Sequence, residues 1–211
     1  MLPMQLKPNI AFPYKEEWNV PTIRECYRIW EKYQMMHHIR EHCLTVAQVA
    51  LTLAKRFGTA GYPLREDMVL ASALLHDIAK SYTIYFGGDH ALLGAAWVMQ
   101  ETQNPAIAQA VLAHVIWFFD EGGQAIENNP CTLPNLISYA DKRVRHDKVV
   151  SLSDRFQDLL KRYGTSEEKI RLINMNYAQS QKIEDALIRS GVDIELEQSR
   201  LVRVQNTKRK K

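Results

Sequence analysis

Hydrophobic and polar residues recur with a helical period along most of the chain from Pro21 onward. In residues 38–57, apolar side chains between Leu44 and Ala54 return every three or four positions, which places them on one face of a helix. Residues 65–80 are apolar on nearly every side, and this favours a buried helix. Alternation typical of a strand nowhere exceeds a few residues. The pattern therefore predicts an all-α protein.

Residues that cap helices mark where further helices begin and end. Asp89 and Asn104 are good N-caps, and Pro105 suits a first helical turn. Gly58 and Gly164 are expected to end helices. Loops are expected at 81–88 and 117–132. One further helix is predicted to begin at Pro21. The others are predicted over 90–101, over 105–116, from Pro134 onward, from Ser151 or Ser153 to Gly164, and from 165–168 toward Gly191.

The chain is predicted to form one main domain with an appendage at each end. Prolines interrupt residues 1–20, which we expect to form an extended N-terminal arm. Residues 21–164 are predicted to be a single multi-helix domain. Residues 165–211 are predicted to be a C-terminal helix and a basic tail. That helix is expected to pack on the core or to form a homodimer contact.

Composition is that of an ordinary globular domain, and it excludes several classes of protein. The 211 residues are 46% hydrophobic and 24% charged, enough for a large core without disulfide staples. The cysteines are Cys26, Cys43 and Cys131, with no CxxC spacing, which excludes a disulfide scaffold and a thiolate zinc site. With no apolar run of membrane-spanning length and no signal-like start, we expect a cytoplasmic protein without a membrane span.

Charge is placed unevenly along the chain. The net charge is +3, and residues 200–211 carry six Lys or Arg and no acid, so the rest sums to about −3. A basic tail of this kind can bind nucleic acid or an anionic surface. It can equally be a solvated chain end, and we take this as the default interpretation.

Histidine and aspartate occur in unusually apolar surroundings. The doublet His76-Asp77 ends the most apolar predicted helix, where a carboxylate is costly unless it is paired or binds a cation. Taken singly, each such residue could be a core histidine or an ion-pair partner. Together, imidazole and carboxylate without thiolate favour Mn, Fe, Mg or Zn in an open catalytic site. The other members of the set are His42, His90, His114 and Asp141.

The local contexts of these residues resemble a known family. The chain is similar to the HD superfamily of metal-dependent phosphohydrolases, in its HDIG-like form, through the ordered set His42, His76, Asp77 and Asp141. The flanking segments match too, as HCLTVA, LLHDIAK and LISYADK. The resemblance covers 38–146, just over half of the chain, and implies an HD-type fold for residues 21–164. A second doublet, His146-Asp147, stands in a polar, basic stretch and is predicted to lie at the surface.

His90 and His114 resemble the extra ligands of HD proteins that hold two metals, among them the diadenosine tetraphosphate hydrolases. The resemblance implies that a first divalent ion is bound by His42, His76, Asp77 and Asp141. It implies a second ion bound by His90 and His114, with Asp77 bridging the two. A bridging carboxylate is needed because two cations about 3.5–4 Å apart repel each other. The implied ions are Fe, Mn or Mg, with Zn or Ni also compatible.

The activity implied is cleavage of a phosphoester or phosphoanhydride of a nucleotide or dinucleotide by a metal-bound hydroxide. Asp77 and Lys80 are the predicted catalytic residues. Lys80 lies four positions after His76 and shares its helix face, where it could stabilise phosphate charge. Lys80, Arg143 and Arg145 are the predicted substrate-binding residues.

Two other functions stay open. One is an HD-type di-iron oxygenase acting on a small phosphonate-like or polyol substrate, because the ligand set alone does not separate oxygen from water activation. The other is a nucleotide- or RNA-binding regulatory module that uses the basic tail. The aromatic run Trp117, Phe118 and Phe119 fits core packing by default and could also stack on a base. The expected partner is a phosphorylated small molecule, with nucleic acid a lesser candidate.

Overall fold

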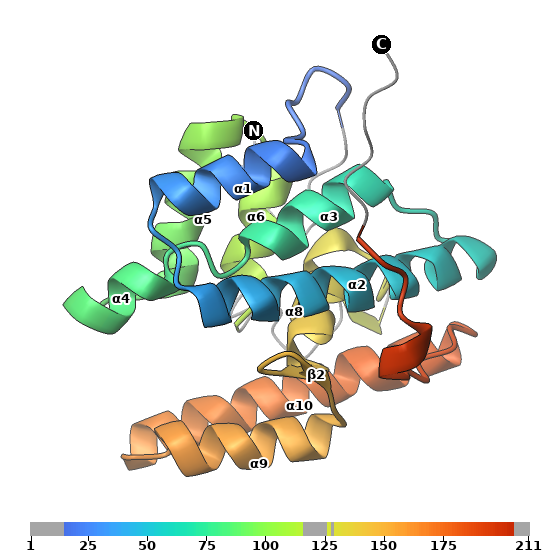
Figure 1. Ribbon diagram of the computed structural model, residues 1–211. Coiled ribbons are helices and arrows are strands. Elements are labelled where there is room, and N and C mark those ends of the chain that lie inside the picture. Colours follow the sequence, from blue (N-terminus) through green and yellow to red (C-terminus); the bar gives the residue numbers. More distant parts are fainter. Residues whose placement is uncertain (1–14, 116–125, 128, 205–211) are drawn as a thin grey trace, which may run out of the picture.

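The computed structural model describes residues 15–115, 126–127 and 129–204, and it consists almost entirely of helices (Figure 1). The predicted all-α class is therefore confirmed. Within the described residues, strands are confined to one antiparallel hairpin, β1 Val144–Arg145 and β2 Lys148–Val149. The helices are α1 Ile23–Lys32, α2 His37–Thr59, α3 Glu66–Leu75, α4 Lys80–Phe86, α5 His90–Thr102, α6 Pro105–Ala113, α8 Leu133–Lys142, α9 Leu152–Tyr163 and α10 Glu167–Arg189, followed by a 3-10 turn Gln198–Arg200.

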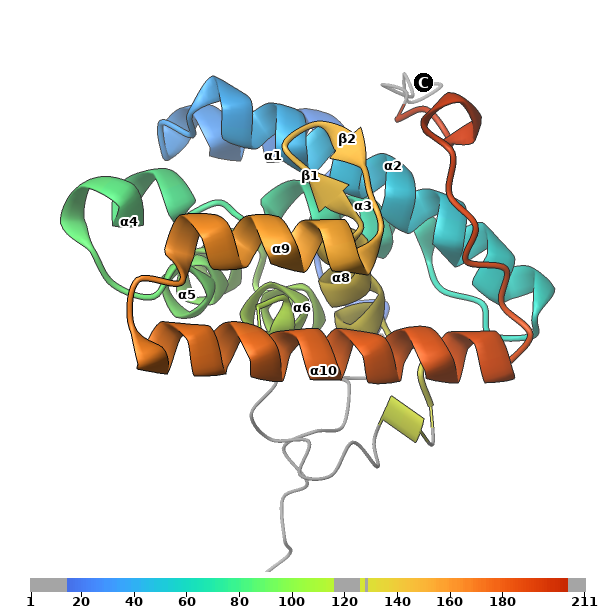
Figure 2. The same ribbon diagram turned by 90° about the horizontal axis from the view of Figure 1, so that it is seen from below.

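The long helix α2 crosses the molecule, and the other elements are arranged around it (Figure 1). Helix α3 packs along α2, and α8 contacts α2, α3 and α6. Helix α5 packs along α6. Helices α9 and α10 lie side by side and cover one side of this assembly, as Figure 2 shows from below. Helix α4 projects at the edge of the molecule beside α5.

A single hydrophobic core joins the early and the late helices. It contains Phe57 from α2, Tyr139 from α8 and Phe156 from α9, all essentially without exposure. Helix α10 adds Ile183 and Leu187 to the same core. The predicted boundary near residue 164 stays a prediction, but the helix after it is packed into the core of the preceding residues.

Side-chain caps fix several helix starts where the sequence pattern placed them. The carboxylate of Asp89 accepts from two backbone N–H groups of α5, and the side chain of Asn104 does the same for α6. Ser151, rather than Ser153, caps α9. Ser166 caps α10. Helix α8 is capped by Thr132, just before Pro134 in its first turn.

The segment after α3 differs from the sequence prediction, which had one helix over 65–80 and a loop over 81–88. Helix α3 ends at Leu75, and the chain then forms a tight turn in which Ile78 N–H donates to the carbonyl of Leu75. A new helix, α4, begins at Lys80 and ends before Gly87. Gly87 has φ +76°, which glycine adopts without strain, and it stops the helix. The helix was missed because its aromatic and β-branched residues have weak helix propensity.

The chain after α10 returns along α2. The guanidinium of Arg56 on α2 donates to the carbonyls of Asp193 and Glu195, at 2.8 and 2.6 Å. The hydroxyl of Thr52 accepts from the backbone N–H of Val202 at 3.0 Å. Residues 193–202 are therefore hydrogen-bonded to α2 and do not project from the molecule.

Several segments named in the sequence analysis cannot be compared with the structure. Most of the N-terminal arm, the aromatic run at 117–119 and the last residues of the basic tail lie outside the described residues. Cys26, Cys43 and Cys131 are all free and buried. None of the described helices combines the length and apolar character needed to span a bilayer.

Candidate metal centre

Side chains far apart in the sequence converge where several helices begin or end. All of them are buried except His90, whose side chain is 27% exposed. Most of them come from helix ends, whereas His42 lies in the second turn of α2. They are His42 of α2, His76 and Asp77 in the turn after α3, His90 at the start of α5, His114 directly after α6, and Asp141 in the last turn of α8.

Asp77 lies at the middle of this group and presents its two oxygens in different directions. Its Oδ2 lies 3.5 Å from His76 Nε2 and 3.9 Å from His42 Nε2. Its Oδ1 lies 3.4 Å from His90 Nε2 and 3.5 Å from His114 Nε2. One carboxylate therefore faces two separate pairs of histidines, one pair with each oxygen.

Asp141 completes the first group. Its Oδ1 lies 2.9 Å from His42 Nε2 and 3.8 Å from His76 Nε2. The first group thus consists of two imidazoles and two carboxylates within a few ångströms. In the second group, His90 Nε2 and His114 Nε2 face each other at 3.2 Å.

Backbone carbonyls set the tautomers of three of these histidines. The Nδ1 atom of His76 lies 2.7 Å from the carbonyl oxygen of Ala73, and that of His114 lies 2.5 Å from the carbonyl oxygen of Val111. The Nδ1 atom of His42 lies 2.8 Å from the carbonyl oxygen of His146. A carbonyl only accepts, so each Nδ1 carries a hydrogen and each ring turns its Nε2 toward the carboxylates. Histidines that bind metals are oriented in this way.

The residues fit a divalent cation. Two buried atoms, His76 Nε2 and Asp77 Oδ1, have no hydrogen-bond partner among the described residues. Lone pairs that face lone pairs and carboxylate oxygens in a buried space are costly unless a positive charge lies between them. Nitrogen and carboxylate donors without thiolate suit Mn, Fe and Zn, and allow Mg. The buried His and Asp groups could therefore hold metal.

Electrostatics favour the metal-binding forms of Asp77, Asp141 and His90. Burial by itself raises the pKa of Asp77, but the surrounding cations and imidazoles, Lys80 foremost, together outweigh burial and hold the pKa well below its usual range. At Asp141, burial likewise raises the pKa, and Lys142 together with the neighbouring imidazoles lowers it well below its usual range. Burial lowers the pKa of His90 to about 4. The carboxylates are thus ionised, and His90 is neutral, at neutral pH.

Three cationic side chains surround the carboxylates. Lys80 Nζ lies 2.7 Å from Asp77 Oδ2, and its side chain is 30% exposed. Lys142 Nζ is buried and lies 2.7 Å from Asp141 Oδ2, and it also donates to the carbonyl of His114 at 2.9 Å. Arg155 of α9 is buried with Nη2 3.8 Å from Asp141 Oδ1. Lys80 therefore connects the buried centre to the surface.

The two arginines predicted to bind substrate are placed differently from Lys80. Arg143 turns its guanidinium toward structural partners: Nε donates to the carbonyl of Val150, and Nη1 donates to the hydroxyl of Tyr139 and the carbonyl of Ile194. Its guanidinium thus joins parts of the fold, and its role in phosphate binding stays a prediction. Arg145 lies half-buried in β1, next to His146.

The second histidine–aspartate doublet lies at the surface, as predicted. The side chains of His146 and Asp147 are exposed in the turn of the hairpin. His146 still affects the centre, because its backbone carbonyl receives the Nδ1 hydrogen of His42. It has φ +58°, a left-handed conformation typical of tight turns.

Sequence reasoning missed Lys142 and Arg155. Lys142 follows Asp141 directly, and a basic residue beside a buried carboxylate is a signal for an ion pair. Arg155 had a detectable signal, because Leu152, Arg155 and Phe156 share the spacing of one helix face and are buried together. A charged residue within a buried helical stripe indicates a buried partner.

Helical packing and a buried histidine–aspartate centre define a class of proteins, and comparison with known families identifies it. The HD domain model matches residues 39–159, more than half of the chain. The chain therefore belongs to the HD domain family. That family is one of metal-dependent phosphohydrolases, and the match supports a metal-dependent hydrolase.

Several curated proteins are similar to parts of the chain. Ribonuclease Y of Sulfurovum sp. is 27% identical over 129 residues, which are 61% of this chain and 24% of that protein. Ribonuclease Y of Wolinella succinogenes is 31% identical over 122 residues, 57% of this chain and 21% of that protein. Uncharacterized protein MJ0778 of Methanocaldococcus jannaschii is 28% identical over 144 residues, 64% of this chain and 83% of that protein.

The chain spans about a quarter or less of the length of these ribonuclease Y relatives. No solved structure matches it at a significant level.

Proposed function

We propose that this protein hydrolyses a phosphoester or phosphoanhydride bond of a nucleotide or dinucleotide, using two divalent cations. The observation that carries the proposal is the position of Asp77, whose two oxygens face two separate groups of ligand-type side chains. Two-metal sites that cleave phosphate bonds need such a shared carboxylate. The ions would be held by His42, His76, Asp77 and Asp141 on one side and by Asp77, His90 and His114 on the other.

Divalent cations bound there would acidify a water molecule and screen the negative charge of phosphoryl oxygens. The protein's own residues then orient the reaction. The backbone carbonyls of Ala73, Val111 and His146 hold the imidazoles in one tautomer. In the hydrolysis, the oxygen of water forms a bond to phosphorus, the bond to the leaving oxygen breaks, and the leaving oxygen takes up a proton.

Lys80 is the residue proposed to contact the substrate phosphate. Its ammonium is held by Asp77 at 2.7 Å, and its side chain reaches solvent, so a phosphoryl oxygen can approach it from outside. A fixed positive charge at this place stabilises the charge that develops on the phosphoryl oxygens. Arg145, beside the hairpin turn, stays a proposed second contact. Arg155 approaches Asp141 from the buried side and is proposed to position that carboxylate.

The test is product release from a panel of nucleotides and dinucleoside polyphosphates with Mn²⁺, Mg²⁺ or Fe²⁺, the last without oxygen. We expect metal-dependent turnover that Asp77→Asn abolishes. The matched control is Asp147→Asn, which changes the aspartate of the exposed doublet and should leave turnover unchanged. Equal activity of the wild type and Asp77→Asn would contradict the proposal. Oxygen consumption with Fe²⁺ and no hydrolysis would support the oxygenase instead.

A second candidate substrate is RNA. It is favoured by the name ribonuclease Y that several relatives carry, because RNA is joined by phosphoester bonds between nucleotides. The same assay with short single-stranded oligoribonucleotides distinguishes it. Shortening of the oligomers that Asp77→Asn abolishes, with no release from free nucleotides, would assign RNA as the substrate.

A further inference from the structure

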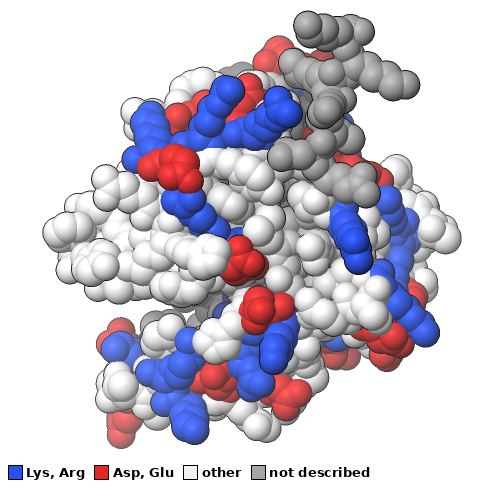
Figure 3. Space-filling view, viewed as in Figure 1, with Lys and Arg blue, Asp and Glu red and all other residues white. Residues whose placement is uncertain are grey.

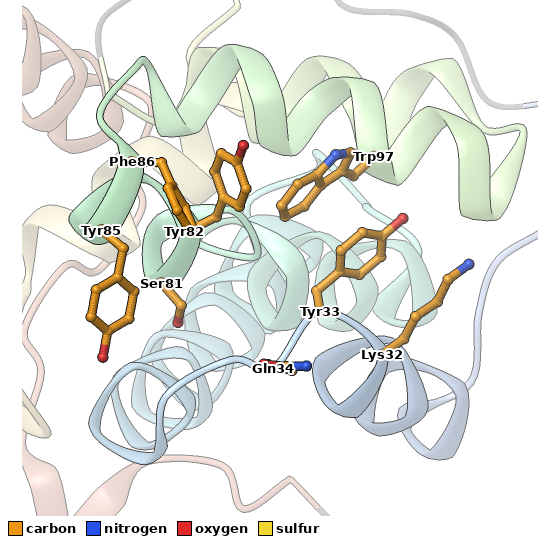
Figure 4. A pocket seen from close by; sticks show the side chains of 8 residues that line it. All are labelled: Lys32, Tyr33, Gln34, Ser81, Tyr82, Tyr85, Phe86 and Trp97. Atoms are coloured by element: carbon orange, nitrogen blue, oxygen red, sulfur yellow. The ribbon is translucent and has the colours of Figure 1, made fainter.

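A pocket of about 330 Å³ is lined by none of the residues of the site described above. It is formed where the end of α1 and the following turn meet α4 and α5 (Figure 4). Figure 4 shows aromatic rings around the opening and polar side chains at its edges. Its lining includes Lys32, Tyr33, Gln34, Ser81, Tyr82 and Trp97.

The aromatic walls are flat and held in place. The rings of Tyr33 and Trp97 stack with centroids 4.3 Å apart and an angle of 18° between their planes. Tyr33 is fixed further because its hydroxyl donates to Glu101 at 2.8 Å. Tyr82 meets Trp97 edge-on, at 5.7 Å and 79°. A fixed aromatic platform of this kind binds planar rings at low entropic cost.

Polar groups at the edges can recognise hydrogen-bonding functions of a ring. Gln34 offers an amide with both a donor and an acceptor, and its φ of +49° holds it in the turn at the rim of the pocket. The hydroxyl of Ser81 accepts from the N–H of Met36 at 2.8 Å and keeps its own hydrogen as a donor. Planar rings with donors and acceptors around their edges are the chemistry of nucleobases.

The exposed face of α4 continues the aromatic surface beyond the pocket walls. Tyr85 and Phe86 also line the pocket, yet their side chains are 72% and 73% exposed. Figure 3 shows an uncharged surface over α4, with side chains of both charges mixed over α1 on one side and over α9 on the other. An exposed aromatic surface of this kind offers stacking partners to bases.

Helix α4 connects the pocket to the metal centre through adjacent residues. Lys80, the first residue of α4, reaches Asp77, and the next residue, Ser81, forms part of the pocket wall. Adjacent residues of a helix point about 100° apart, so α4 offers a phosphate-type contact and a base-type contact on two neighbouring faces.

We propose that this pocket binds a nucleobase of the substrate, stacked against the aromatic rings of α1, α4 and α5 and recognised at its edge by Gln34 and Ser81. The proposal rests on the proposed function, because the base belongs to the nucleotide whose phosphate is cleaved. It adds a base-binding subsite to a centre that otherwise recognises only phosphate and metal.

The test measures base binding apart from catalysis. Adenosine and uridine carry a base but no phosphate, so they cannot be hydrolysed at the centre, and ribose is the probe without a base. Each is titrated into the full-length, metal-loaded protein while tryptophan fluorescence is followed. We expect both nucleosides to quench the fluorescence and ribose to leave it unchanged. Trp97→Phe should remove the quenching, which assigns the signal to the pocket.

A matched pair of variants locates the contact on α4. Phe86→Ala removes an exposed ring that lines the pocket, and Ile84→Ala removes an exposed apolar side chain of the same helix that does not line it. Because both side chains are largely exposed, neither change should unfold the protein. We expect Phe86→Ala to weaken nucleoside binding about five-fold or more, and Ile84→Ala to leave it unchanged.

The outcomes separate this proposal from the proposed function. Quenching by ribose, equal effects of the two variants, or no quenching by either nucleoside in folded protein would overturn the base subsite, whether or not the protein hydrolyses nucleotides. Nucleoside binding that Phe86→Ala weakens would support the subsite even if the hydrolysis panel is negative. In that case the hydrolytic function would fail and the binding site would remain.

Discussion

At the scale of single residues, Asp77 organises the centre, because each of its oxygens faces a different pair of histidines. The sequence allowed the ligand-type residues and their order to be predicted, since histidine and aspartate in apolar segments are conspicuous. It did not allow the carbonyl partners to be predicted. Every residue has a carbonyl, so those of Ala73, Val111 and His146 carry no signal in the sequence.

Arg143 is a residue for which structure and sequence lead to different expectations. Its guanidinium joins α8 to the carbonyl of Val150 and to that of Ile194 after α10. Arg143→Ala is expected to lower the free energy of unfolding by about 2 kcal/mol, because hydrogen bonds from a charged donor are lost. Denaturant unfolding measures this change. The KM of the folded enzyme should stay as in the wild type.

Arg145→Ala is the matched control for that change. Arg145 lies two positions further along, and the described residues show no ion pair or hydrogen bond of its side chain comparable to those of Arg143. Its removal should leave stability nearly unchanged. If Arg143→Ala instead raises the KM and does not lower stability, Arg143 binds substrate after all.

At the scale of elements, the turn between α3 and α4 allows both residues of the His76-Asp77 doublet to face the metal centre. Adjacent residues of a straight helix point about 100° apart, so a helix through 65–80 would separate His76 from Asp77. The turn ends α3 at Leu75 and brings both side chains to one centre. Periodicity could not reveal this, because the apolar pattern continues through the turn.

The packing of α5 on α6 sets the distance between His90 and His114. Gly94 of α5 allows this close approach, since a Cβ atom there would lie 3.2 Å from Val111 Cγ1. Val111 and Ile78 are fully buried and have little room to move, so Gly94→Ala is expected to push the helices apart. This overpacking should outweigh the better helix propensity of alanine and lower the free energy of unfolding by about 1 kcal/mol. Thermal unfolding measures the effect.

Gly58→Ala is the control, because a Cβ atom at that position of α2 meets nothing within 4 Å. Alanine is a better helix former than glycine, so this variant should be as stable as the wild type or more stable. Loss of stability in both variants, to the same degree, would show that the effect at Gly94 does not come from helix packing.

At the scale of the whole molecule, the centre joins parts of the chain from His42 to Asp141. The helical class and the single core could be predicted from periodicity and caps, which are local. For α10, the sequence left open whether the helix packs on the core or forms a homodimer contact, and it gave no sign that residues 192–204 dock. Both depend on contacts of Arg56, Arg143 and Leu187 with segments far away in the sequence.

Because bound ions would link these segments, removing them should destabilise the fold. Treatment with a chelator is expected to lower the Tm, since a ligand present at a hundred times its Kd stabilises the folded state by about 2.7 kcal/mol. Differential scanning calorimetry with and without EDTA measures the shift. Asp77→Asn should show a much smaller shift than the wild type, and equal shifts would contradict the link between Asp77 and metal.

The most direct test of the central claim is the metal content of the purified chain after loading with Mn²⁺ and dialysis. The account predicts two ions per chain in the wild type. It predicts one ion in the double variant His90→Ala/His114→Ala, which keeps His42, His76, Asp77 and Asp141. The same metal content in both proteins, or no bound metal in the folded wild type, would contradict a centre in which Asp77 bridges two ions.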